Sequence, residues 1–176
     1  MAKFFNTAGP CRPEKHYMLS PLDRIPKIMQ VIEDENYFVL HAPRQTGKTT
    51  TFLALAQELT QQGKYAAVLL SVEVGSAFTD DIGAAEQAIL ASFHTMAETW
   101  LPSELWPPSW PDTKPGGAIQ AALSAWSKTC PRPLVLFIDE IDSLQNQVLL
   151  SVLRQLRNGY NTRPKAFPQS VALIGM

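Results

Sequence analysis

Residues 37–50 read Y-F-V-L-H-A-P-R-Q-T-G-K-T-T, and the first five have the apolar character and β-propensity of a buried strand. A turn follows, and the G-K-T triplet then stands at the head of a helical pattern. Residues 42–49 match the phosphate-loop template G-x-x-x-x-G-K-[ST], except that Ala42 replaces the first glycine. The stretch therefore predicts a strand, a phosphate-binding loop and a helix, in that order.

A phosphate-binding loop needs backbone N–H groups that converge beside the positive end of a helix dipole. Gly47 lets the backbone approach closely, Lys48 is expected to contact the β- and γ-phosphates, and the Thr49 hydroxyl is expected to ligate Mg²⁺. In the alternative interpretation Gly47 is an ordinary turn glycine and Lys48 is solvated, but a cation in the first turn then opposes the helix dipole. The residues expected to line the nucleotide are Ala42, Pro43, Arg44, Gln45, Thr46, Gly47, Lys48, Thr49 and Thr50.

Residues 134–144 read L-V-L-F-I-D-E-I-D-S-L, in which five apolar residues run into two consecutive carboxylates, Asp139 and Glu140. A buried strand of this form, a Walker B strand, places both carboxylates at the carboxyl edge of the sheet, where open α/β folds bind ligands. Asp139 is expected to hold Mg²⁺, while Glu140 orients or deprotonates the attacking water and is, with Lys48, a predicted catalytic residue. The alternative is a strand whose acidic end only caps the next helix through Asp142. Two independent motifs in the expected order favour the nucleotide site.

The stretches A-P-R-Q-T-G-K-T-T and L-F-I-D-E-I-D-S-L resemble those of the ASCE division of P-loop NTPases, and within it the AAA-like and STAND-type bacterial ATP-binding proteins. The resemblance covers roughly residues 15–176. It implies an α/β fold, a three-layer α/β/α P-loop NTPase core whose parallel sheet has four strands in the spatial order 1-4-3-2. It also implies a sensor residue, a fifth strand, an arginine finger and a helical lid, none of which can be fitted after Met176. The core is therefore expected to be truncated after its fourth strand, as the front part of a longer ATPase.

Apolar runs and helical periodicity place the other elements. Strands are expected at about residues 36–41, 65–72, 134–138 and 171–175, and helices at about residues 26–34, 48–62, 80–99, 117–128 and 145–158.

The expected domain organisation is an extended arm at residues 1–20 and an ATPase core at residues 21–176. A helical and Pro/Trp-rich insertion is expected within the core at about residues 76–132. Its proline-rich loop is predicted to cover one edge of the sheet with Trp100, Trp106 and Trp110. A lid or a partner-binding surface is the alternative.

The composition is that of one domain without a basic surface. A chain of 176 residues with a net charge of −1 gives no electrostatic support for nucleic-acid binding. Its two cysteines, Cys11 and Cys130, form neither a C-x-x-C pair nor a zinc-binding pattern. No apolar segment suits a signal peptide or a membrane span, so a cytoplasmic protein outside the membrane is expected.

The two motifs predict Mg-ATP binding, with hydrolysis coupled in the complete protein to movement of an additional C-terminal domain or a protein partner. The chain is an ATPase by motif, although a sensor residue, an arginine finger and a lid are not evident. Two alternatives stay open: a nucleotide-dependent signalling switch with negligible turnover, and a non-hydrolysing interaction module on an ATPase scaffold. A homo-oligomer and GTP also stay open, but no N-K-x-D motif for guanine occurs.

Overall fold

The computed structural model describes residues 15–17, 25, 27–43 and 46–176. Most of the arm expected at residues 1–20 lies outside the described residues, and so do Arg44 and Gln45 of the predicted loop. The strands and helices expected from the sequence all occur, with shifts of a few residues at their ends.

The centre of the fold is a parallel sheet of four strands in the order β1-β4-β3-β2. In chain order the strands are β1 (Phe38–His41), β2 (Ala66–Ser71), β3 (Leu134–Asp139) and β4 (Ser170–Gly175). Every residue of β3 is buried, which explains why its sequence is a continuous apolar run. The predicted strand order and parallel pairing are confirmed.

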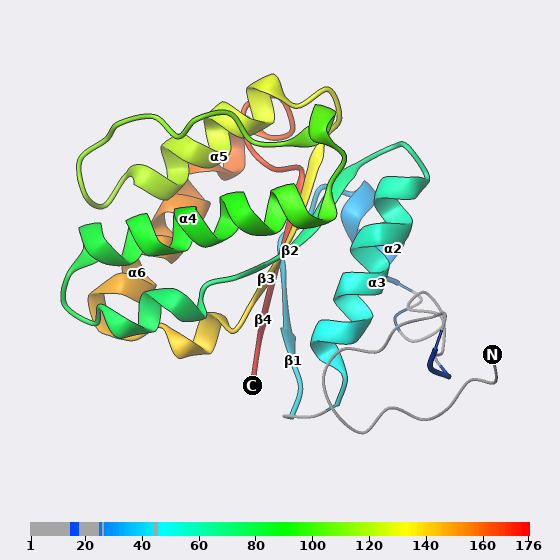
Figure 1. The fold of residues 1–176 in the computed structure, drawn as a ribbon, viewed down its shortest axis with the longest axis horizontal. Coiled ribbons are helices and arrows are strands. Elements are labelled where there is room, and N and C mark those ends of the chain that lie inside the picture. Colours follow the sequence, from blue (N-terminus) through cyan, green and yellow to red (C-terminus); the bar gives the residue numbers. More distant parts are fainter. Residues whose placement is uncertain (1–14, 18–24, 26, 44–45) are drawn as a thin grey trace.

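Helices cover both faces of the sheet and complete three layers (Figure 1). One face is covered by α2 (Ile28–Glu33) and α3 (Lys48–Gln61). The other face is covered by α4 (Ile82–Trp100), α5 (Ala118–Thr129) and α6 (Asn146–Gly159). The three-layer α/β/α fold predicted from the sequence is therefore confirmed.

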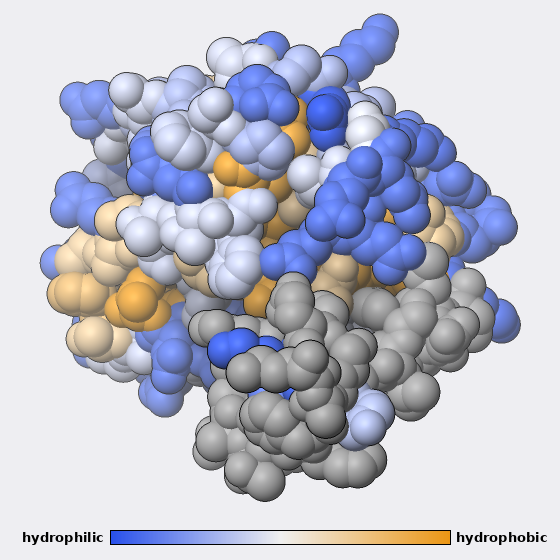
Figure 2. Space-filling view, turned by 45° about the vertical axis from the view of Figure 1, so that its right-hand side comes forward, coloured by the Kyte–Doolittle hydropathy of each residue, from blue (hydrophilic) through white to orange (hydrophobic). Residues whose placement is uncertain are grey.

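The sheet separates two apolar cores. On the side of α3, Phe52 packs on Phe137 of β3 with the ring centroids 4.9 Å apart. On the opposite side, Trp126 of α5 is fully buried. The face shown in Figure 2 carries mainly hydrophilic side chains, with hydrophobic ones in separate areas. Among the described helices, none combines the length and the hydropathy needed to cross a bilayer.

Helices α4 and α6 start later than predicted, and each shift has a local cause. Helix α4 starts after Asp81, whose Oδ1 accepts a hydrogen bond from the Ala84 N–H at 2.9 Å and caps the first turn. Before α6, residues Ile141–Ser143 form a 3₁₀ turn and Leu144 is extended, so the helix begins only at Asn146.

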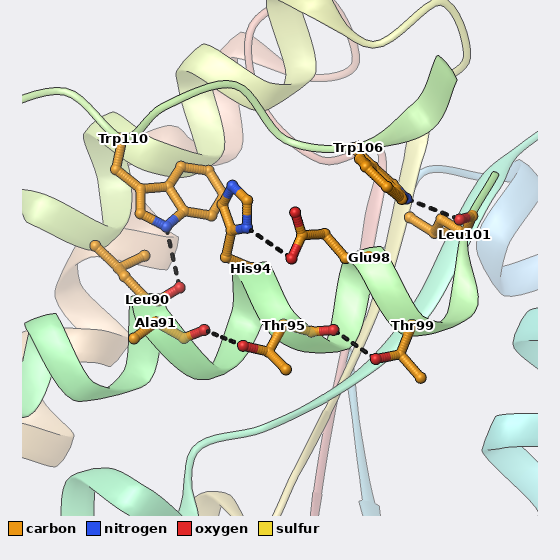
Figure 3. Close-up of polar contacts among 9 residues, drawn as sticks. All are labelled: Leu90, Ala91, His94, Thr95, Glu98, Thr99, Leu101, Trp106 and Trp110. Atoms are coloured by element: carbon orange, nitrogen blue, oxygen red, sulfur yellow. Dashed lines mark hydrogen bonds and ion pairs between the residues drawn. The ribbon is translucent and has the colours of Figure 1, made fainter. Parts of the chain in front are cut away.

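Residues 101–117, which join α4 to α5, are called the strap below. The strap runs along the helical layer, and its Trp110 points toward α4 (Figure 3). Trp110 donates its indole N–H to the Leu90 carbonyl at 3.0 Å and packs edge-to-face with Trp126, 6.1 Å away. The other two predicted tryptophans, Trp100 and Trp106, stay about 40% exposed. The strap packs on the helices through Trp110 and also through Leu105, which is fully buried and whose carbonyl accepts from the Trp126 indole N–H at 3.0 Å.

Strand β1 lies at one edge of the sheet, as predicted. Its burial alternates, because Phe38 and Leu40 face α2 and α3 while Val39 on the opposite face is 71% exposed. An open groove of about 700 Å³ runs between this face of β1 and the side of α6 that carries Leu153 and Leu156.

Candidate functional site

The predicted phosphate loop joins β1 to α3. Gly47 stands immediately before α3 with φ 80° and ψ 24°, a left-handed conformation that glycine adopts without steric cost. Within the loop, the Thr46 hydroxyl donates a hydrogen bond to the Pro43 carbonyl at 2.9 Å. The described part of the loop thus turns sharply into a helix of 14 residues, whose N-terminus points its first N–H groups toward the loop.

The Lys48 side chain folds back over this loop. Its Nζ donates hydrogen bonds to the Ala42 carbonyl at 2.5 Å and to the Pro43 carbonyl at 2.9 Å. An ammonium has three donors, and the described residues accept from two of them. Among the described residues Lys48 takes part in no ion pair. The helix dipole opposes a cation at this position, and an anion bound at the helix N-terminus would offset that opposition.

Thr49 and Asp139, one from each predicted motif, are in direct contact. The Thr49 hydroxyl donates to Asp139 Oδ2 at 2.7 Å, and Asp139 Oδ1 accepts from the Glu140 N–H at 3.0 Å. The carboxylate of Asp139 is only 5% exposed and stands at the carboxyl end of β3. One carboxylate and one hydroxyl suit Mg²⁺, which is usually held by one or two protein ligands together with phosphates and water. Thr50 follows in the same first turn of α3.

Glu140 leaves the strand in a left-handed conformation, with φ 60° and ψ 36°. This turn ends the strict alternation of β3, so the carboxylate of Glu140 need not point away from that of Asp139. Partial burial raises the pKa of Glu140, and a hydrogen bond to Glu73 together with the negative charges of Glu73, Asp139 and Asp142 raises the pKa further. The predicted catalytic base is therefore easier to protonate than an ordinary glutamate.

Glu73 belongs to this site, although the sequence analysis did not identify it. Strand β2 pairs with β3 so that Ser71 lies opposite Asp139, and the Val72 N–H donates to the Asp139 carbonyl at 3.3 Å. Glu73 follows directly, in a 3₁₀ turn, and reaches Glu140. A signal was present in the sequence, because Glu73 is the first charged residue after a buried apolar run, as Asp139 is.

The end of β4 also lies at this edge, where the resemblance implies a polar sensor residue. The structure has Gly175 there, and a Cβ at this position would lie 2.8 Å from Asp142 Oδ1. A side chain at this position would therefore require the Asp142 carboxylate to move. The second aspartate of D-E-I-D thus contacts the last residue of β4.

A small cavity of about 170 Å³ adjoins the loop on the side of α3. Its lining includes Ile25, Leu40 and Phe52, together with the start of α3. Of the arm expected at residues 1–20, the structure describes residues 15–17, and Tyr17 among them is 57% exposed.

The chain is similar to known proteins both in its family and in its fold. The model of the AAA domain family matches residues 32–176. A solved structure of Drosophila ORC bound to poly(dA/dT) DNA and Cdc6 is similar in fold, with a TM-score of 0.52 at 14% sequence identity. The match covers 89% of this chain and 24% of the ORC chain, so the present chain spans about a quarter of that protein. No curated protein matches significantly. Because the family model covers most of the sequence, the chain belongs to the AAA domain family of P-loop NTPases.

Proposed function

We propose that the chain binds Mg-ATP between the loop at residues 42–50 and the acidic end of β3. The observation that carries this proposal is the 2.7 Å contact between Thr49 and Asp139, which brings together two motifs that are 90 residues apart in the sequence. The sequence pattern of the loop, taken alone, also fits an ordinary turn between a strand and a helix. A buried carboxylate in contact with its first helical hydroxyl is the donor set that a Mg²⁺-bound triphosphate requires.

Each residue has a distinct part in this proposal. The Lys48 ammonium and the first N–H groups of α3 bind the phosphates, and Thr49 and Asp139 hold Mg²⁺. Mg²⁺, when bound, offsets the negative charge of the phosphates. Glu140 accepts a proton from a water aligned with the γ-phosphate. In the complete protein, hydrolysis would be coupled to movement of a further domain or a protein partner. The core would comprise residues 21–176, with an insertion at about 76–132.

A switch with very slow turnover is the second candidate, and one observation favours it. The hydrogen bond of the Glu140 carboxyl to Glu73 and the surrounding negative charges raise the pKa of Glu140, so at a given pH more of it is protonated than of an ordinary glutamate, and the protonated form is not a base. In that state the site binds nucleotide without cleaving it.

The test is calorimetric titration of the protein with Mg-ATP, using Lys48→Ala and a matched control. A charged hydrogen bond contributes roughly 1.5–3 kcal/mol, so Lys48→Ala is expected to weaken binding by roughly 10- to 100-fold. Lys64→Ala is the control, because Lys64 is an exposed lysine whose ion pair with Glu33 lies away from the loop. If Lys48→Ala and the unaltered chain bind Mg-ATP equally well, the proposal fails.

Turnover separates the two candidates. Glu140→Gln keeps the shape of the side chain but removes the base, so nucleotide affinity should persist in either case. Measurable phosphate release that disappears in Glu140→Gln supports the hydrolase. Tight binding without phosphate release in the unaltered chain supports the switch.

A further inference from the structure

A buried carboxylate lies far from the nucleotide site, in the helical layer. Glu86 of α4 is 1% exposed, between the buried apolar residues Ala85 and Ile89. Its Oε1 accepts a hydrogen bond from Gln155 Nε2 at 2.5 Å, and its Oε2 accepts one from the Gly116 N–H at 2.8 Å. No ion pair involves Glu86 in the described part of the chain. A carboxylate is costly to bury, and here neutral donors alone compensate for that cost.

Gln155 of α6 extends this contact into a network. It is 2% exposed, its Nε2 also donates to the Ser151 hydroxyl at 3.1 Å, and its Oε1 accepts from the Gln120 N–H at 3.0 Å. The side chains of Glu86, Gln155 and Ser151, with the N–H groups of Gly116 and Gln120, are called the polar lock below. The polar lock joins α4, α6, the end of the strap and the first turn of α5.

The polar lock replaces the usual cap of α5. The residue before this helix is Gly117, which has no side chain, and no side-chain cap is present at that position. The Gln120 N–H, in the first turn, is one of the donors that a capping residue would otherwise satisfy. Gln155 satisfies it from another helix. Glu86 does the same for Gly116, whose φ of +87° turns the chain into α5.

Residues 111–116 of the strap make few contacts with the helical layer besides the polar lock. Residues 111–116 are all exposed and contain no helix or strand. Upstream, the Trp110 indole is anchored on the Leu90 carbonyl, and Pro115 packs against Gly83. A segment with exposed backbone and few buried contacts opens locally at low free energy. Its attachment to the layer therefore depends on Trp110 at one end and on the polar lock at the other.

We propose that the end of the strap detaches from the helical layer when the hydrogen bonds of the polar lock break. When the polar lock opens, residues 111–117 detach from the helical layer and the Gln120 N–H loses its acceptor, while the sheet and the phosphate loop keep their structure. Buried polar networks of this kind fix one arrangement of the packed elements at some cost in stability, which an apolar core would not do. The insertion thus contains a movable segment, residues 111–117, which the polar lock holds in place.

Glu86→Gln tests the proposal with little change of shape. The substituted side chain has one acceptor and one donor group, so the network loses an acceptor and gains a donor. If Gln155 turns its amide to compensate, its nitrogen then faces the Gln120 N–H. Both backbone N–H groups keep their acceptors only if the two side-chain amide nitrogens face each other, and this repulsion also weakens the network.

The measurement is amide hydrogen exchange followed by NMR. The amides of Gly116 and Gln120 are expected to exchange about tenfold faster or more in Glu86→Gln, while those of β3 keep their protection. Glu98→Gln is the control on the same helix, since Glu98 is exposed and pairs only with His94. Unchanged protection at Gly116 and Gln120, or an equal loss throughout β3, would overturn the proposal.

A second variant covers the case in which Glu86→Gln fails to fold. The double substitution Glu86→Met and Gln155→Met replaces the pair with apolar side chains of similar length, which often leaves stability unchanged or raised. The expected result is a thermal midpoint at or above that of the unaltered chain, with fast exchange at Gly116 and Gln120. Slow exchange at both amides in this folded variant would show that the polar lock does not hold the strap.

Discussion

Thr49 and Asp139 are in hydrogen-bond contact, Oγ1 to Oδ2, at 2.7 Å. The contact depends on two strands that are not neighbours, because β4 lies between β1, which leads to Thr49, and β3, which ends in Asp139. Parallel strands bring their carboxyl ends to one edge, and this places a hydroxyl and a buried carboxylate on either side of the expected Mg²⁺ position.

The first prediction concerns the Mg²⁺ dependence of binding. Asp139→Asn keeps a side chain of the same shape but removes the negative charge that attracts a hard cation. We expect Mg²⁺ to strengthen ATP binding by the unaltered chain, and this gain to fall by about tenfold or more in Asp139→Asn. The measurement is ATP titration with Mg²⁺ and with EDTA. Asp112→Asn, an exposed position in the strap, should behave as the unaltered chain does.

The second prediction uses two glycines with the same backbone conformation. Gly47 has φ 80° and Gly63, just beyond the other end of α3, has φ 83°. Alanine in this region costs roughly 1–2 kcal/mol, so each substitution should lower the thermal midpoint by roughly 2–8 °C. No atom lies within 4 Å of a Cβ built at Gly63, so Gly63→Ala reports backbone strain alone.

Only Gly47→Ala should weaken nucleotide binding, because its Cβ lies where the backbone approaches the phosphates. Scanning calorimetry gives the stabilities and nucleotide titration gives the affinities. Equal nucleotide affinities in the two variants would contradict the position assigned to the phosphates.

The third prediction concerns the ionisation of Glu140. Because burial and the neighbouring carboxylates raise its pKa, the folded chain binds this proton more tightly than the unfolded chain does. The stabilising contribution of the protonated group is complete below the unfolded pKa and is lost as the pH rises through the raised folded pKa. Glu73→Gln removes one of the negative charges and should lower the pKa of Glu140.

The pKa of Glu140 can be followed by carbon NMR of its carboxyl group in Mg²⁺-free protein. Asp142→Asn should lower the pKa of Glu140 by less than Glu73→Gln does, because the charge of Asp142 is the smallest of the causes that raise this pKa. Any hydrolysis that uses Glu140 as a base should show the same displacement of its pH profile toward lower pH in Glu73→Gln. A larger effect of Asp142→Asn than of Glu73→Gln would contradict the contact with Glu73.

Much of the fold was predictable because the decisive strands are buried on both faces. The continuous apolar runs of β2 and β3 have no other simple explanation, and the two motifs fix which end of the sheet binds ligand. The order of the strands came from resemblance. The start of α6 could not be predicted, because the 3₁₀ turn at Ile141–Ser143 follows from the left-handed Glu140, and sequence periodicity does not report a single such residue.

Contacts between distant side chains were not predictable. Glu86 looks like a surface residue in a helical pattern, and only the packing of α4 on α6 buries it against Gln155. Lys48 was expected to reach phosphates, but nothing in the sequence indicates that it also bonds to the carbonyls of its own loop. Roles for the loop residues, Asp139 and Glu140 remain predictions that the experiments above can test.

The last prediction concerns the open edge of the sheet at β1. An edge strand presents unpaired N–H and C=O groups, and Val39 adds an apolar side chain that is 71% exposed. We therefore expect the chain to self-associate at high concentration. Val39→Lys should suppress this association, because a charged side chain on an edge strand opposes pairing with a second strand, and proteins commonly protect their edges in this way. The free energy of unfolding should stay within about 0.5 kcal/mol of that of the unaltered chain, since the side chain is mostly in solvent.

Sedimentation velocity over a concentration series measures the association. Leu150→Lys removes a similar exposed hydrophobic residue from α6, 44% exposed and not part of the edge strand, and should have a much weaker effect. If the two lysine variants suppress association equally, general hydrophobic contact is the cause and the edge of β1 has no special part in it.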